Sequence, residues 1–341
     1  MGALPERGTI AISFVREALV VLHERGVDCA ELLGRAGIAP ALLALPEARV
    51  SVRNYAKLWH LTAEVLDDEF FGMDSHGMKA GSFTLLCHAV IHAENLERGL
   101  ARAMRFLRIV LDDLEIGLLR DGEVASIVIS ERKRGGSSLG APKRAFAYGT
   151  LLLILHGLAC WLVGRRIPIL SADFRCSEPD FSREWRVLFS QQPRFDRPET
   201  AITFAAEYLD MTNIQNERSM KEFLRYAPAN FLVKYKNSAS LTARIRRRLR
   251  DMAPEDWPTC AGVAELFNMS QATLRRRLEA EGQSYRTIVE DFRRDLAISL
   301  LSDSHKTVAE IAGDLGFAET SAFHRAFRKW TGTSPRQYRP D

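Results

Sequence analysis

The sequence contains few cysteines, and none has the spacing typical of metal binding or redox chemistry. Five occur among the 341 residues (Cys29, Cys87, Cys160, Cys176 and Cys260), and no two form a CxxC pair. This odd, unpaired set argues against a disulfide framework and against a zinc ribbon. The first residues also lack the apolar run of a secretory signal. We therefore expect reduced thiols and a cytoplasmic location.

A strong net charge is absent as well. The chain carries 47 Lys and Arg against 43 Asp and Glu, a net charge of +4, which does not by itself indicate nucleic-acid binding. Hydrophobic residues make up 46% and charged residues 26%, as in ordinary globular proteins. The length suggests two or three domains. Most of the basic excess lies in residues 241–341, where it occurs in clusters.

Only one long hydrophobic run is present. Ala145–Val163 (AFAYGTLLLILHGLACWLV) contains no formal charge and is long enough to cross a membrane. Two glycines and His156 interrupt the run, and no second run of this kind exists. A helix buried against a sheet or a subunit partner is favoured, and a membrane span is the alternative.

Motifs for catalysis or cofactor binding are also missing. Arg132–Gly136 is basic and glycine-rich but lacks the spacing of a phosphate-binding loop. It is typical of a surface loop, with an anionic-ligand site as the alternative. His88 and His92 lie one helical turn apart without the HExxH pattern, which favours packed or surface histidines over a metal site. The sequence therefore predicts no enzyme, no metal site and no cofactor.

Residues 1–225 combine helical and strand patterns. Apolar residues recur at helical spacing in some segments and form β-branched runs in others. An Asp-Gly pair within Arg120–Glu123 predicts a hairpin turn. The predicted helices are Thr9–Arg25, Val52–Leu66, Leu85–Leu107 with a break at His92–Asn95, Ala145–Val163 and Phe181–Ser190; the predicted strands are Val110–Leu119, Val124–Ser130, Ile169–Arg175 and Ala201–Ala205.

This order of elements predicts an α+β domain over residues 1–225. Residues 226–240 contain a proline and a polar stretch and are predicted to be a linker. Residues 241–341 read as an all-α domain. Within the first domain, the hairpin, the Ile169–Arg175 strand and the charge-free helix are the most apolar neighbours, so we expect them to form a pocket or a dimer face.

The last hundred residues contain an internal repeat. Val263–Leu266 (VAEL) returns as Val308–Ile311 (VAEI), and each copy precedes a turn and a second helix. In these second helices, apolar pairs four residues apart mark a buried face: Leu274 with Leu278, and Phe323 with Phe327. A doubled supersecondary unit is the organisation to test first.

The first copy has the features of a helix-turn-helix over residues 259–280. Ser270 is a good N-cap for the helix Gln271–Glu281. Because Leu274 and Leu278 face inward, Gln271, Arg275 and Arg276 point elsewhere. This arrangement places the second helix in a DNA major groove.

The second copy, over residues 307–330, repeats the arrangement. Thr307 and Glu310 have capping-box spacing, and Gly316 suits the turn. The helix Thr320–Trp330 would expose Ser321, His324, Arg325 and Arg328, and arginine is well suited to bidentate contact with guanine.

A helix at Tyr285–Leu301 would hold the two copies at a fixed separation. Two recognition helices about 34 Å apart fit successive major grooves on one face of the duplex. A helical bundle with solvated arginines is the alternative interpretation. The occurrence of cap, turn and exposed arginine in both copies favours DNA binding.

Residues from about Ser238 to Asp341 resemble the AraC/XylS family of bacterial transcription regulators. The resemblance rests on Val308–Arg339, with Gly316-Phe317, Ser321, Phe323, Arg325, Phe327, Gly332, Ser334-Pro335 and Tyr338-Arg339 at the positions of the family pattern. It implies that Ala272, Arg275 and Arg276, and likewise Ser321, Ala322 and Arg325, contact bases or backbone. The full set of candidate DNA-binding residues is Ser270, Gln271, Ala272, Thr273, Arg275, Arg276, Thr320, Ser321, Ala322, His324, Arg325 and Arg328.

The N-terminal two-thirds are similar to the arabinose-binding-type domain of the OruR-like branch of this family. The shared points are Arg53–Tyr55 with Leu58-Trp59, Phe71-Gly72, Asn95–Leu100 and Phe181–Phe204. The resemblance implies an effector-binding or dimerisation domain. It implies a regulator, activator or repressor, whose partners are double-stranded promoter DNA, a small-molecule effector, a second copy of the chain and, for an activator, RNA polymerase.

Two other functions remain as alternatives. A DNA-targeted enzyme of the alkyl-transfer repair type would need a four-cysteine cluster and a Pro-Cys-His acceptor, and the sequence has neither. A membrane-tethered regulator would require Ala145–Val163 to span a bilayer.

Overall fold

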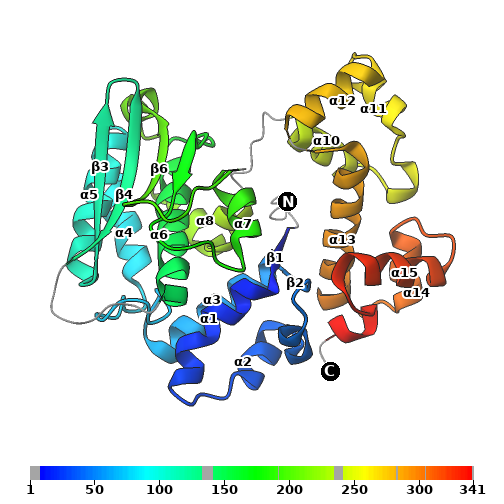
Figure 1. Ribbon diagram of the computed structural model, residues 1–341, viewed down its shortest axis with the longest axis horizontal. Coiled ribbons are helices and arrows are strands. Elements are labelled where there is room, and N and C mark those ends of the chain that lie inside the picture. Colours follow the sequence, from blue (N-terminus) through cyan, green and yellow to red (C-terminus); the bar gives the residue numbers. More distant parts are fainter. Residues whose placement is uncertain are drawn as a thin grey trace. The chain divides into compact units, whose positions relative to one another are not determined.

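The computed structural model describes residues 8–132, 141–190, 192–233, 241–281, 283–303 and 305–339. The chain divides into two compact units (Figure 1). The first unit contains Ser13–Ala36 and Val52–Tyr235, and the second contains Arg7–Ile12, Gly37–Ser51 and Lys236–Asp341. Two short segments from the start of the chain thus belong to the same unit as the C-terminal helices.

The first unit is an α+β fold built around one antiparallel sheet. Its strands follow the order β3-β4-β6-β5. Its elements are α1 (Ile12–Glu24), α2 (Cys29–Ala36), α3 (Val52–Leu66), α4 (Ser82–Ile91), α5 (Leu96–Val110), β3 (Leu114–Asp121), β4 (Val124–Glu131), α6 (Ala141–Leu162), β5 (Ser171–Asp173), α7 (Ser182–Leu188), β6 (Thr200–Ala205), the 3₁₀ turn η2 (Ala206–Asp210), α8 (Glu217–Tyr226) and α9 (Ala229–Val233).

The predicted hairpin is present. Asp121 pairs with Val124, and Gly122 occupies the turn at φ +57°, which glycine adopts without strain. Alternate residues of β4, such as Ala125, Ile127 and Ile129, are buried and define the core side of the sheet. Strand β3 was predicted to begin at Val110 but begins four residues later, at Leu114, because α5 continues to Val110.

The charge-free run forms α6, which lies in the core of the first unit. It is the one helix among the described residues long and apolar enough to cross a membrane, and its Arg144–Leu162 window is entirely buried. Its glycines allow close packing: a Cβ on Gly149 would lie 2.9 Å from Trp185 Nε1, and one on Gly157 would clash with Phe231. The buried-helix interpretation accounts for this helix.

A buried histidine on α6 predicts a pH dependence of stability. Burial lowers the pKa of His156 to about 4, and its Nε2 lies 2.9 Å from the Ile167 carbonyl oxygen. The side chain is therefore neutral when folded but takes up a proton near pH 6.5 when unfolded. We expect the free energy of unfolding to fall as the pH drops from about 6.5 towards 4, by about 1 kcal/mol per pH unit.

This pH dependence is measured from urea unfolding of the first unit at pH 7.5 and 5.5. His156→Gln keeps a donor for the Ile167 carbonyl and removes the titration, so it should lose less stability on acidification than the parent chain. Equal losses in both proteins would contradict the assignment.

The second unit is mostly helical. Its elements are β1 (Thr9–Ala11), the 3₁₀ turn η1 (Pro40–Ala44), β2 (Arg49–Ser51), α10 (Leu241–Arg250), η3 (Pro254–Asp256), α11 (Cys260–Leu266), α12 (Gln271–Ala280), α13 (Tyr285–Asp303), α14 (Val308–Asp314), α15 (Thr320–Thr331) and η4 (Pro335–Tyr338). α11–α12 and α14–α15 are the two predicted helix-turn-helix units, and α13 is the predicted connecting helix.

Strands β1 and β2 form a two-stranded ribbon that was not predicted from the sequence. Thr9 pairs with Ser51 and Ala11 with Arg49. The ribbon is fastened to the C-terminal helices, because Thr9 Oγ1 donates to Asp295 Oδ1 (2.7 Å) and the Arg49 amide donates to Tyr338 Oη (3.0 Å). The predicted helix over Thr9–Arg25 therefore begins at Ile12, after the strand.

The ribbon changes the predicted division of the chain. Residues 1–225 were expected to form one continuous domain, whereas Gly37–Ser51 packs with the C-terminal helices. The predicted linker over residues 226–240 contains α9, whose Phe231 and Leu232 are buried. Residues 234–240 lie outside the described part of the chain, as does most of the basic Arg132–Gly136 segment.

Thr9→Val tests the contact between the ribbon and α13. The buried Asp295 carboxylate would lose a hydrogen-bond donor, so we expect a loss of about 1–2 kcal/mol in the stability of the second unit. The measurement is hydrogen exchange of peptides covering α13. Thr84→Val, the same change at an exposed position of α4, should leave this protection intact. Unchanged protection in Thr9→Val would show that the contact contributes nothing.

Candidate DNA-binding surface

The first helix-turn-helix is fixed by local caps and a compact core. Thr259 Oγ1 accepts from the Gly262 amide at the start of α11, and Ser270 Oγ accepts from the Thr273 amide at the start of α12 (3.1 Å). Asn268 takes a left-handed conformation (φ +52°) in the intervening turn. The predicted N-cap at Ser270 is confirmed, and such caps contribute about 1 kcal/mol each.

One face of α12 is buried and the other is open. Leu274 and Leu278 are at most 1% exposed and pack with residues of α10 and α13. Gln271, Ala272, Arg275 and Arg276 are exposed on the other side, whereas Thr273 is half-buried and shares a hydrogen bond with Ser270. Within the described residues, neither Arg275 nor Arg276 has an ion-pair partner.

The second helix-turn-helix repeats this construction with aromatic packing. Thr307 and Glu310 form the predicted capping box, and Gly316 adopts φ +74° in the turn. Phe323 and Phe327 are fully buried, and the Phe327 ring packs edge-on against Tyr338 at 5.0 Å. The helix α15 starts after Glu319, whose carboxylate accepts from Ser321 Oγ (3.0 Å).

The predicted reading residues of α15 differ in exposure. Ser321, His324, Arg325 and Arg328 are exposed, while Thr320 and Ala322 are half-buried. Arg325 and Arg328 have no ion-pair partner in the described part of the chain. Both second helices therefore present exposed arginines opposite their buried apolar pairs.

Helix α13 carries a small network of charges that links it to α10. Arg294 contacts Asp291 (2.8 Å) and the buried Asp295 (3.1 Å), and Asp291 also lies 3.6 Å from Arg246 of α10. Ile288, Ala297 and Ile298 are buried along the same helix. Ile288 and Phe292 also belong to the apolar cluster that contains Leu274 and Leu278, so α13 packs against the first helix-turn-helix.

The basic helix α10 is only partly available to DNA. Its Leu241, Ile245 and Leu249 are buried. Arg244 stacks on the ring of Phe267 at 4.7 Å, and Arg246 is held near Asp291. Arg247 and Arg248 are exposed. The sequence alone could not separate the arginines that pack from those that remain free.

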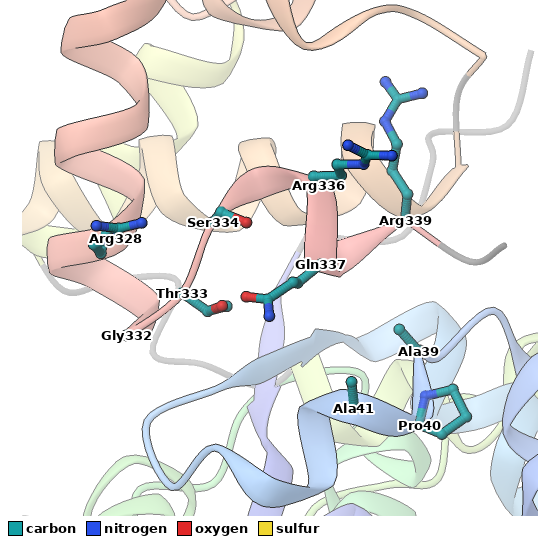
Figure 2. Close-up of a pocket in the computed structure, with 10 residues that line it drawn as sticks. All are labelled: Ala39, Pro40, Ala41, Arg328, Gly332, Thr333, Ser334, Arg336, Gln337 and Arg339. Carbon is teal, nitrogen blue, oxygen red and sulfur yellow. The ribbon is translucent and has the colours of Figure 1, made fainter.

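A basic cleft beyond the end of α15 adds cationic residues that were not predicted as DNA-binding. Its volume is about 920 Å³, and its lining residues are Ala39, Pro40, Ala41, Arg328, Gly332, Thr333, Ser334, Arg336, Gln337 and Arg339. Figure 2 shows Thr333 and Gln337 pointing towards each other, Arg336 extending from η4 and Arg339 extending from the residue directly after it. Arg339 belongs to the family pattern and Arg336 lies between its Ser334-Pro335 and Tyr338-Arg339 pairs, so this position was the available signal.

The histidines considered as metal ligands do not form a site with other ligands. His88 and His92 are exposed, whereas the neighbouring Cys87 is buried, and this burial raises the pKa of its thiol to about 12. Among the described residues, no group of three or more His, Cys, Asp or Glu side chains could hold a metal ion.

Comparisons with known proteins assign both parts of the chain. The family model for the arabinose-binding domain of AraC transcription regulators matches residues 26–213, and a helix-turn-helix domain model matches residues 263–341. The ornithine utilization regulator of Pseudomonas aeruginosa is 26% identical over 332 residues, covering 97% of this chain and 96% of the relative. The transcriptional activator AggR of Escherichia coli is 29% identical over 170 residues, covering 48% of this chain and 60% of the relative.

Among solved structures, the transcriptional regulator CdpR of Pseudomonas aeruginosa is similar with a TM-score of 0.32 and 22% identity over 76% of this chain and 83% of that one. The match to the arabinose-binding model covers more than half of the sequence, and the helix-turn-helix model covers both helical repeats from Val263 onward. The chain therefore belongs to the AraC family of DNA-binding transcription regulators.

Proposed function

We propose that this regulator reads promoter DNA through α12 and α15 together. The observation that carries the proposal is the repeated geometry: each helix follows a turn with a left-handed residue, buries an apolar pair and exposes arginines without an ion-pair partner among the described residues. The reading residues are those exposed on the two helices, chiefly Gln271, Arg275, Arg276, Ser321, His324 and Arg325. Arg328 and Ser270 lie at the edges of this surface and suit phosphate contacts.

The half-buried members of the predicted set have smaller parts in this proposal. Thr273 supports the cap of α12, and Thr320 and Ala322 can approach DNA only with their exposed atoms. Ala272 and Ala322 offer methyl groups, which suit contact with a thymine methyl. Charged and amide side chains therefore carry most of the base discrimination.

The proposal extends to the cell-level role of the chain. The first unit binds a small-molecule effector, the protein acts in the cytoplasm as a homodimer, and an activating form contacts RNA polymerase. Membership of the AraC family supports these statements, as does the full-length match to a curated regulator. The same relatives are transcription regulators, which disfavours the alkyl-transfer enzyme.

The test uses DNA selected by the full chain from a random-sequence pool. The dissociation constant of that DNA is measured at several salt concentrations and compared with that of a scrambled duplex. We expect a steep salt dependence for both and a tighter, sequence-dependent constant for the selected DNA. Equal affinity for both duplexes would overturn sequence-specific reading.

A further inference from the structure

The first unit contains a small aromatic cavity next to the start of the chain segment that leads to the DNA-binding helices. Its volume is about 50 Å³, and it is partly open to solvent. The lining residues come from α3, α4, α6, α9 and the loop after α3: Trp59, His60, Ala63, Glu69, Met78, Phe83, Ile154, Ala227, Pro228 and Phe231. The hairpin, the Ile169–Arg175 strand and the charge-free helix were expected to form a pocket or a dimer face, and of these only α6 lines this cavity, through Ile154.

Three aromatic rings form a continuous wall of this cavity. The Phe231 ring lies 6.1 Å from Trp59 and 5.8 Å from Phe83, measured between ring centroids. Trp59 is itself held by Phe71 at 4.6 Å and by a hydrogen bond from its Nε1 to the Glu69 carbonyl oxygen (3.2 Å). The rings are therefore fixed before any ligand arrives, which lowers the entropic cost of binding.

The charged side chain in the lining is a carboxylate with a fixed position. Glu69 Oε1 accepts from the Gly81 amide and Oε2 from the Phe83 amide, both at 2.7 Å. Among the described residues, Glu69 makes no ion pair. A carboxylate beside aromatic faces is the combination that attracts an organic cation, because the ring quadrupoles and the negative charge act in the same direction.

The size of the cavity limits the group that it can hold. A water molecule needs about 10–15 Å³ on this scale, so the cavity takes a group of about four or five non-hydrogen atoms, with the rest of a larger ligand leaving through the open side. We infer that this cavity binds the alkylammonium head of an amine effector. The inference deepens the proposed effector-binding function and rests on it.

The cavity also touches the element through which a ligand would act on DNA binding. Ala227, Pro228 and Phe231 belong to the start of α9 and its preceding turn, and α9 ends at Val233, before α10 begins at Leu241. His60 Nε2 lies 2.8 Å from the Ala227 carbonyl oxygen, and Gly157 of α6 receives Phe231 at close range. A ligand in the cavity therefore contacts α9 directly, and it alters DNA binding only if its affinity differs between two arrangements of that helix.

Two probes of equal shape separate a cation site from a merely apolar one. The tert-butylammonium ion and tert-butanol each have five non-hydrogen atoms and differ in charge. Binding of each to the full chain is measured by ligand-observed NMR at pH 7.5. We expect millimolar binding of the cation and at least tenfold weaker binding of the alcohol. Equal binding of both, or binding of neither, would overturn the inference.

Two variants test whether the Glu69 carboxylate and the aromatic rings bind the cation. Glu69→Gln should lower the affinity for the cation at least tenfold and leave the affinity for the alcohol unchanged. Glu64 is an exposed carboxylate on α3, and Glu64→Gln should change neither affinity. Phe83→Leu keeps an apolar wall but removes an aromatic ring, so it should weaken binding of the cation and not of the alcohol. This variant provides the test if Glu69→Gln does not fold. A cation affinity that survives both variants would overturn the assignment.

The affinity for selected DNA is measured in the same samples with and without the cation. We expect the cation to change the DNA dissociation constant in the parent chain and not in Glu69→Gln. Sequence-specific DNA binding without any cation effect would overturn the coupling through α9 while leaving DNA reading intact. Loss of sequence-specific binding itself would instead contradict the proposed function.

Discussion

Replacing Arg276 and Arg325 together by alanine is expected to abolish most sequence-specific DNA binding. Each arginine is exposed, has no ion-pair partner among the described residues and lies opposite a buried apolar pair. An arginine that reads a base contributes about 1–3 kcal/mol. Because the two residues lie on separate helices, their losses should add to about 2–6 kcal/mol, or roughly 30-fold to 10⁴-fold in affinity.

The pattern of the loss is as informative as its size. Each single variant should relax sequence preference at the bases that its own helix contacts, while loss of a phosphate contact would weaken all sequences alike and reduce the salt slope by about 1. The readout is fluorescence anisotropy with selected DNA and with single-base variants of it. Arg102→Ala, an exposed arginine of α5 in the first unit, is the charge-matched control and should bind normally. Unchanged affinity and preference in the double variant would show that other residues read the DNA.

Phe327→Ala is expected to unfold the second helix-turn-helix locally. The side chain is fully buried, and its ring lies 5.6 Å from Phe323 and 5.0 Å from Tyr338. Removing a buried phenylalanine side chain costs about 3–5 kcal/mol, because the lost burial and the cavity left behind add together. A unit of this size has little more stability than that to lose.

Hydrogen exchange by mass spectrometry measures this effect without assuming a two-state transition of the whole chain. Peptides covering α14 and α15 should lose protection in Phe327→Ala, and those covering α11 and α12 should keep most of theirs. His324→Ala changes an exposed residue of the same helix and should alter protection by less than about 0.5 kcal/mol. His324→Ala should weaken DNA binding without changing the stability of the helix. Full protection of α15 in Phe327→Ala would mean that the aromatic cluster is not what holds this helix.

The helix-turn-helix repeat could be predicted from the sequence because its determinants are local. The Ser270 cap, the Thr307–Glu310 box and the apolar pairs four residues apart all act within one or two helical turns. A buried helix was also favoured for the α6 segment, because two glycines and His156 interrupt the run and no second run of this kind occurs.

The ribbon and the aromatic cavity could not be predicted because their determinants are far apart in the sequence. Thr9–Ala11 becomes a strand only because Arg49–Ser51 lies beside it, and a three-residue strand has no periodicity of its own. The cavity collects Trp59, Phe83 and Phe231 from separate helices. Each of these residues, taken alone, resembles an ordinary core aromatic.

The predicted list of DNA-contacting residues shows a similar limit. Helical spacing separated the buried face of α15 from the open one, but it could not show that Thr320 and Ala322 are half-buried. Nor could it show that Arg244 of α10 stacks on Phe267 while Arg247 and Arg248 remain exposed. These differences depend on which neighbouring helix covers each position.

The docked ribbon bears on how this protein can be recombined with others. A chimera that grafts residues 241–341 onto a foreign sensor domain would leave Asp295 and Tyr338 without the Thr9 and Arg49 partners they have here. The transplantable module is therefore discontinuous, and it includes Arg7–Ile12 and Gly37–Ser51 as well as the C-terminal helices. Exchanging sensors between relatives would succeed only where both the ribbon and its binding face come from the same parent.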